Sequence, residues 1–253
     1  TGAVKGKGGS MHLFDAPRHN YGGHGIVGGQ LPLAAGVGFS QRYQKKDGVV
    51  VVLFGDAAVN NGAFHESLNM AAVWKLPVVF VCENNRYGMG TAIERTSAVP
   101  EVWRRASAYG IRGEAVDGMD VLAVRDAVAR AAEECRPRDG KPVLLEARTY
   151  RYRGHSMADP ATYRTRDEVE QEKRRDPLEV LLQHAKAAGA ELAASDLERL
   201  EAEVAGEVEA AVRFAEESPD PEPEAIWRDV YASEDDAALH RDDLGDVVPI
   251  GRF

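Results

Sequence analysis

Residues 48–90 read GVVVVLFGDAAVNNGAFHESLNMAAVWKLPVVFVCENNRYGMG, and this stretch decides the fold. It opens with Val49 to Phe54, an unbroken apolar run rich in β-branched residues, which is typical of a strand buried on both faces. Apolar residues then recur at helical spacing from about Val59 to Trp74, and a second apolar run covers Val78 to Cys82. This order of strand, helix and strand predicts a crossover between two parallel strands.

Polar side chains follow both predicted strands. Asp56 comes directly after the first strand and Asn85 after the second, so the crossover should bring both to the carboxyl edge of the sheet, where ligands bind. A carboxylate and an amide oxygen suit Mg²⁺, which fills its other positions with phosphates and water. The small residues Gly55, Ala57 and Ala58 would let the backbone approach those phosphates, at the anion-attracting start of the next helix. The pattern therefore predicts a magnesium-diphosphate site.

Three stretches carry a resemblance to a family. The pairing of Gly-Asp-small with a later Asn-Asn resembles the thiamine diphosphate motif. The wording NMAAVWKLPVVFVCENNRYGMGT is similar to the alpha subunit of the decarboxylating component of 2-oxo acid dehydrogenase complexes. The resemblance extends through YGGHGIVGGQLPLAAG (21–36) and TYRYRGHSMADPATYRTRDE (149–168), and it covers roughly Lys5 to Tyr231. One departure is Ala57, where the family motif more often has Gly.

The resemblance implies a fold and a cofactor site. The fold would be the thiamine diphosphate-binding α/β fold, a mostly parallel, doubly wound sheet flanked by helices. Asp56, Asn85 and the peptide oxygen of Tyr87 would hold Mg²⁺. The backbone at Gly25 and Val27 would hold the aminopyrimidine of thiamine diphosphate.

The resemblance also implies a catalytic residue and a reaction. His155 follows a predicted strand, Pro142 to Ala147, and would lie by the diphosphate and the reacting carbon. The reaction would be the oxidative decarboxylation of a 2-oxo acid, with transfer of the acyl group to a lipoyl carrier. Implied partners are a beta subunit in an α₂β₂ heterotetramer and the lipoyl acyltransferase core.

Several alternatives stay open at this point. The sequence GHSMADP…YRTRDE looks more like the pyruvate-using members, but branched-chain 2-oxo acid and acetoin dehydrogenases share much of the pattern. A non-catalytic cofactor-binding subunit is a further alternative, against which the joint presence of Asp56, Asn85 and His155 argues. A nicotinamide dehydrogenase is disfavoured because no GxGxxG lies between a strand and a helix.

Composition bounds the class of protein. The chain has 253 residues and a formal net charge of −10, which argues against nucleic acid as a partner. No apolar run approaches the roughly 18 residues that span a bilayer, and the two cysteines are expected to be reduced thiols in a cytoplasmic protein. Residues 1–232 are expected to form the cofactor-binding domain, with an N-terminal part of the family pattern missing. Residues 233–253 are expected to be an acidic, disordered tail.

Local patterns predict the other elements of the fold. They indicate a helix of small residues up to about Tyr43, a helix over residues 98–109, and a strand from Ile111 to Val116. Asp120 is expected to cap a helix from Val121 to about Glu134.

Overall fold

Four strands form a parallel sheet in the computed structural model, which describes residues 2–228. The strand order is β1–β2–β6–β5, and every neighbouring pair is parallel. The bounds of these strands are β1 Val50–Gly55, β2 Val78–Asn84, β5 Arg112–Asp117 and β6 Val143–Arg148. The strand–helix–strand crossover predicted from residues 48–90 is therefore confirmed.

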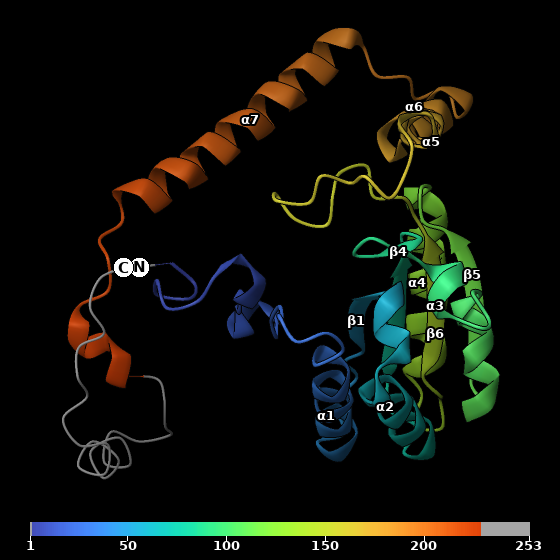
Figure 1. Cartoon of the computed structure of the whole chain (residues 1–253). Helices are drawn as coiled ribbons and strands as arrows, with labels where there is room; N and C mark the ends of the chain where they lie inside the picture. The colour runs from blue at the N-terminus through green and yellow to red at the C-terminus, as the bar shows by residue number, and fades with distance from the viewer. Residues whose placement is uncertain (1, 229–253) are drawn as a thin grey trace. The chain divides into compact units, whose positions relative to one another are not determined.

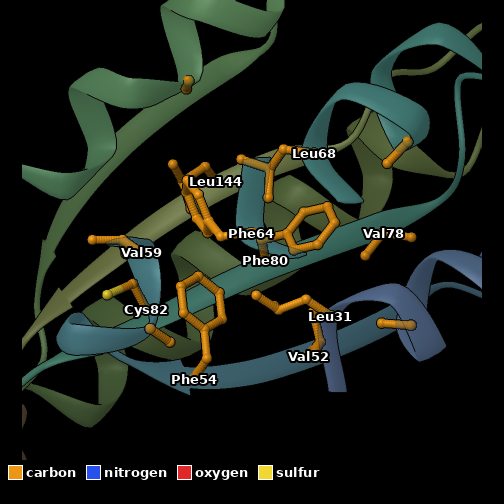
Figure 2. Packing of buried hydrophobic residues seen from close by; sticks show 14 of the residues in the cluster. Leu31, Val52, Phe54, Val59, Phe64, Leu68, Val78, Phe80, Cys82 and Leu144 are labelled. Carbon is orange, nitrogen blue, oxygen red and sulfur yellow. The ribbon is translucent and has the colours of Figure 1, made fainter. Parts of the chain in front are cut away.

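Helices cover both faces of this sheet, of which β1, β5 and β6 are labelled in Figure 1. On one face α1 (Gln30–Tyr43) and α2 (Gly62–Val73) bury Leu31, Phe64 and Leu68 against the sheet. Figure 2 shows these side chains around Phe54 and Phe80. On the other face α4 (Val121–Cys135) contacts β2, β5 and β6 and packs its small side chains against Val79 and Leu145. The doubly wound α/β fold is thus confirmed.

The prediction that the first strand is buried on both faces is wrong. In β1, Val52 and Phe54 are buried, but Val51 and Leu53 are 45% and 55% exposed. The reason is position, because β1 stands at the end of the strand order and α4 lies over the other three strands. The second strand, β2, has the expected buried pattern on both faces.

Two helices differ from the sequence prediction, one in the residue at which it begins and the other in its helix type. The residues after Asp56 form a 3₁₀ helix, η3 (Asp56–Asn60), and α2 begins only at Gly62, where the Asn61 side chain accepts a hydrogen bond from the Ala63 N–H. The helix expected over 98–109 is the 3₁₀ helix η4 (Val102–Tyr109). The cap at Asp120 is confirmed, since its side chain accepts from the first N–H groups of α4.

Short elements connect these parts. A two-stranded hairpin and a four-residue helix follow β2, and two helices follow the loop after β6. Their bounds are β3 Tyr87–Gly88, β4 Thr91–Ala92, α3 Ile93–Thr96, α5 Arg166–Lys173 and α6 Pro177–Ala187.

The chain divides into two compact units. Residues 24–199 hold the sheet, and the described residues 2–23 and 200–228 belong to the other unit. The described part of that second unit contains 3₁₀ turns, η1 Ser10–His12, η2 Ala16–Arg18 and η5 Pro223–Trp227, together with most of α7, Ala194–Glu217. The tail predicted for residues 233–253 lies outside the described residues. Within residues 2–228, no helix is long and apolar enough to cross a bilayer.

Candidate functional site

The carboxyl edge of the sheet brings together the two residues that the crossover pattern singled out. Asp56 follows β1 and Asn85 follows β2, and the register pairs Gly55 with Glu83. The Asp56 side chain is only 3% exposed. Its pKa is raised, chiefly because burial penalises the charged form. Backbone hydrogen bonds from Asp56 itself and Asn85, and the positive charge of Arg151, oppose that shift.

The third expected metal ligand lies beside the second. The Asn85 Oδ1 accepts a hydrogen bond from the Tyr87 N–H at 3.3 Å, which folds the chain so that the Tyr87 peptide oxygen is near that side chain. Arg151 then contacts both. One terminal nitrogen of its guanidinium lies 3.4 Å from Asn85 Oδ1 and 3.1 Å from the Tyr87 oxygen, and the other lies 2.6 Å from the Met89 oxygen. The Asn85, Tyr87 and Met89 oxygens therefore converge on one positively charged group, the Arg151 guanidinium.

These donors fit a hard divalent cation. They are one buried carboxylate, one amide oxygen and one peptide oxygen, all of which are ligands that Mg²⁺ accepts. Over the described range 2–228 there is no group of three or more His, Cys, Asp and Glu side chains that could hold a metal.

The backbone beside Asp56 is open on one side. A Cβ added at Gly55 would meet nothing within 4 Å, and Ala57 is exposed. Ala58 is different, because its side chain is 3% exposed and belongs to the hydrophobic core, which leaves only its backbone for a ligand. The turn that follows Asp56 is the 3₁₀ helix η3, so the anion-attracting start of an α-helix expected there lies further on, at Gly62.

The turn before α1 is tied to the start of α2. The Val27 carbonyl accepts a hydrogen bond from Asn61 Nδ2 at 3.0 Å, and Gly28 has a positive φ of 81° that favours glycine. The Val27 side chain is 61% exposed, and Gly25 is exposed as well. This turn is thus fixed in place while presenting an apolar side chain to the outside.

His155 lies on the loop that follows β6, with its side chain exposed. The loop is held by Asp159, whose Oδ2 accepts from the His155 N–H at 2.7 Å and from the Tyr163 hydroxyl at 2.9 Å. The pKa of Asp159 is lowered, chiefly by the His155 N–H and next by the Ala161 N–H. Arg151 donates to the same Tyr163 hydroxyl at 2.9 Å. A chain of hydrogen bonds therefore connects the His155 backbone with the oxygens around Arg151.

Comparison with known proteins identifies the family of this chain. A model of the dehydrogenase E1 component family matches residues 1–224. The chain belongs to the dehydrogenase E1 component family. Members of this family are thiamine diphosphate-dependent enzyme components that decarboxylate 2-oxo acids.

Curated relatives of this E1 chain include pyruvate dehydrogenase E1 component alpha subunits. The protein from Rickettsia bellii is 44% identical over 235 residues, which are 91% of this chain and 70% of the relative. That from Rhizobium meliloti is 47% identical over 231 residues, 90% of this chain and 66% of the relative. The mitochondrial protein of Schizosaccharomyces pombe is 48% identical over 244 residues, 95% of this chain and 58% of the relative.

Two side chains of this E1 chain that contact the site were missed by sequence reasoning. Arg151 is the third residue after β6, and its place at a strand end on the ligand edge was a usable signal. Glu168 on α5 accepts from the hydroxyls of Tyr87 at 2.9 Å and Tyr150 at 2.8 Å. No local sequence pattern predicts that contact, because a loop of irregular structure connects β6 with α5.

Proposed function

We propose that this E1 chain is the alpha subunit of a pyruvate dehydrogenase, which oxidatively decarboxylates pyruvate and transfers the acetyl group to a lipoyl carrier. The relatives named above are pyruvate dehydrogenase alpha subunits, and they match nearly the whole chain. The loop GHSMADP…YRTRDE (154–168) favours the same substrate. The oxygens of Asn85 and Tyr87 that meet at the Arg151 guanidinium are the observation that carries a cation-dependent site.

We propose that Asp56, Asn85 and the Tyr87 peptide oxygen hold Mg²⁺, which would bind the diphosphate of thiamine diphosphate. The convergence of the Asn85 and Tyr87 oxygens on the Arg151 guanidinium supports this set, as does the buried Asp56 carboxylate, whose charge a cation would stabilise. Gly55, Ala57 and the Ala58 backbone would lie against the diphosphate.

The remaining residues position the cofactor and the substrate. Thiamine diphosphate, when bound, supplies the nucleophilic carbon and the electron sink for decarboxylation. Gly25 and Val27 would hold its aminopyrimidine through their backbone, on the turn that Asn61 fixes. His155 would hydrogen-bond with the substrate through its exposed imidazole, and Asp159 keeps the His155 backbone in place for that role.

Two protein partners follow from the proposal. One is a beta subunit, in an α₂β₂ heterotetramer, and the other is the lipoyl acyltransferase core of a multienzyme complex. A cytoplasmic location remains a prediction, because the relatives include both bacterial and mitochondrial proteins. The net charge of −10 still argues against a nucleic acid partner.

The test is turnover of the alpha chain purified together with its beta partner, with thiamine diphosphate and Mg²⁺. Pyruvate, branched-chain 2-oxo acids and acetoin are offered in parallel with an artificial electron acceptor. We expect turnover of pyruvate that exceeds that of the other substrates. Preference for a branched-chain acid or acetoin would assign the chain to that alternative. Absence of turnover with all three substrates, while the cofactor is bound, would support the alternative of a non-catalytic cofactor-binding subunit.

A further inference from the structure

Glu146 is a carboxyl group buried in the middle of the sheet. It lies on β6, is 1% exposed, and with Asp56 makes up the pair of buried carboxyl groups found within residues 2–228. Sequence reasoning treated the surrounding run as an apolar strand, and the roles proposed above do not use this side chain. A carboxyl group is costly to bury unless it is well hydrogen-bonded, so its partners are informative.

Both oxygens of Glu146 accept hydrogen bonds. The Oε1 atom accepts from Asn84 Nδ2 at 2.8 Å, and the Oε2 atom accepts from the Trp103 backbone N–H at 3.1 Å. The Arg148 guanidinium, on a half-exposed side chain, lies 3.5 Å from Oε1. Both partners at hydrogen-bond distance are N–H donors, so the surroundings of Glu146 require a hydrogen-bond acceptor at each of its two oxygen positions.

The bond to Asn84 fixes the orientation of that amide. With its nitrogen toward Glu146, Asn84 presents its Oδ1 to the Arg86 N–H, which donates to it at 3.1 Å. The reverse orientation would place two oxygens against each other at Glu146 and two N–H groups against each other at Arg86. Glu146 therefore decides which way Asn84 points.

That orientation matters because of the turn that Asn84 closes. Arg86 has φ of +72°, a left-handed conformation that is unfavourable for a non-glycine residue. On either side of it stand Asn85 and Tyr87, whose oxygens are the proposed metal ligands. The hydrogen bond from the Arg86 N–H to Asn84 supports this unfavourable turn.

We propose that Glu146 is a positioning residue for the cation site. It orients Asn84, which holds the Asn85–Tyr87 turn in the shape that presents two oxygens to the metal. This inference rests on the proposed function, since it concerns the Mg²⁺ site named there.

The test compares Glu146→Gln with Glu83→Gln in the assembled protein with its beta partner. Glutamine keeps the shape of Glu146 but cannot accept at both positions. Glu83→Gln removes the same charge from an exposed side chain on β2 next to Asn84. Calorimetric titration with Mg²⁺ in the presence of thiamine diphosphate should show binding weakened about 10- to 100-fold for Glu146→Gln, as for other residues that orient metal ligands. The affinity of Glu83→Gln should match that of the wild type.

A purely structural role is separated by thermal melting with and without the ligands. Loss of stability alone would lower both melting temperatures equally, whereas a positioning role reduces the rise on adding Mg²⁺ and thiamine diphosphate. If Glu146→Gln does not fold, Asn84→Ala takes its place, because it removes the bond to Arg86 and leaves the Glu146 charge. We expect the same weakening of Mg²⁺ binding for this variant.

The outcomes distinguish this inference from the proposed site. If Asp56→Ala loses Mg²⁺ binding while Glu146→Gln or its replacement, Asn84→Ala, titrates like the wild type, the role of Glu146 is overturned and the site stands. If Asp56→Ala also titrates like the wild type, the proposed cation site itself is overturned.

Discussion

The guanidinium of Arg151 lies 3.1 Å from the peptide oxygen of Tyr87, although 64 positions separate the two residues in the sequence. One follows β6 and the other follows β2, and these strands are neighbours in the sheet. Parallel pairing is what brings the two strand ends to one edge. The site is thus a consequence of the sheet topology, with each crossover delivering one group to the same edge.

Glu168 should stabilise the loop that carries Tyr87. It accepts from the hydroxyls of Tyr87 and of the buried Tyr150. Glu168→Ala leaves these donors without their acceptor, so we expect a loss of about 1–3 kcal/mol in the free energy of unfolding, measured by denaturant titration. Glu170→Ala, on the exposed side of the same helix, is the control and should change little. Equal losses in the two variants would contradict the assigned role.

Gly88 should be required because of Ala57. A Cβ at Gly88 would lie 2.6 Å from the Ala57 Cβ, so Gly88→Ala must displace the hairpin that begins at Tyr87. We expect weaker Mg²⁺ binding by calorimetry and a destabilisation of about 1–3 kcal/mol from overpacking. Adding Ala57→Gly should restore much of both. A double variant as impaired as the single one would show that the contact is not the cause.

Two glycines of α1 should respond in opposite directions to alanine. Gly36 is exposed with nothing within 4 Å of an added Cβ, so Gly36→Ala should raise the free energy of unfolding by about 0.5–1 kcal/mol. Gly38 is buried and an added Cβ would lie 2.7 Å from Val78 Cγ2, so Gly38→Ala should lower it. Thermal melting of both variants checks the packing of α1 on β2. Similar shifts in melting temperature for the two variants would contradict this packing.

Ionisation of Tyr150 should lower the free energy of unfolding at alkaline pH. Burial raises the pKa of Tyr150 to about 12, together with the hydrogen bond to Glu168 and the negative charge of that residue. A folded-state pKa above the ordinary value of about 10 means that the stabilisation is complete below pH 10 and is lost as pH rises from about 10 to about 12. Tyr150→Phe should flatten the pH dependence of unfolding in this window. The exposed Tyr43→Phe should leave it unchanged, and identical profiles for all three proteins would refute the assignment.

The sequence predicted the crossover and its two polar ends because both depend on local patterns. Apolar runs and helical spacing placed β1, α2 and β2, and Asp56 and Asn85 stand directly after strands. The exposed face of β1 could not be predicted, since an apolar run is the same whether a helix covers one side or two. The 3₁₀ helix η3 was not separated from α2, because the spacing of apolar residues does not distinguish a 3₁₀ turn from the first turn of an α-helix.

The parts of the site that were missed depend on contacts across long separations. Arg151 and Glu168 lie 66 and 81 positions from Asn85 and Tyr87, the residues that they contact. The roles expected for Gly25, Val27 and His155 came from resemblance and stay predictions. Glu146 was hidden within an apolar strand pattern, where its burial and its two hydrogen bonds became visible only in three dimensions.

The measurement that tests the central claim most directly is a calorimetric titration of the alpha chain, assembled with its beta partner, with Mg²⁺ in the presence of thiamine diphosphate. We expect the wild type to bind and Asp56→Ala to lose Mg²⁺-dependent binding of the cofactor. The loss should be at least as large as the 10- to 100-fold typical of residues that only orient metal ligands, because Asp56 would contact the metal itself. An unchanged affinity in Asp56→Ala would contradict the assignment of the carboxyl edge of this sheet as the cofactor site.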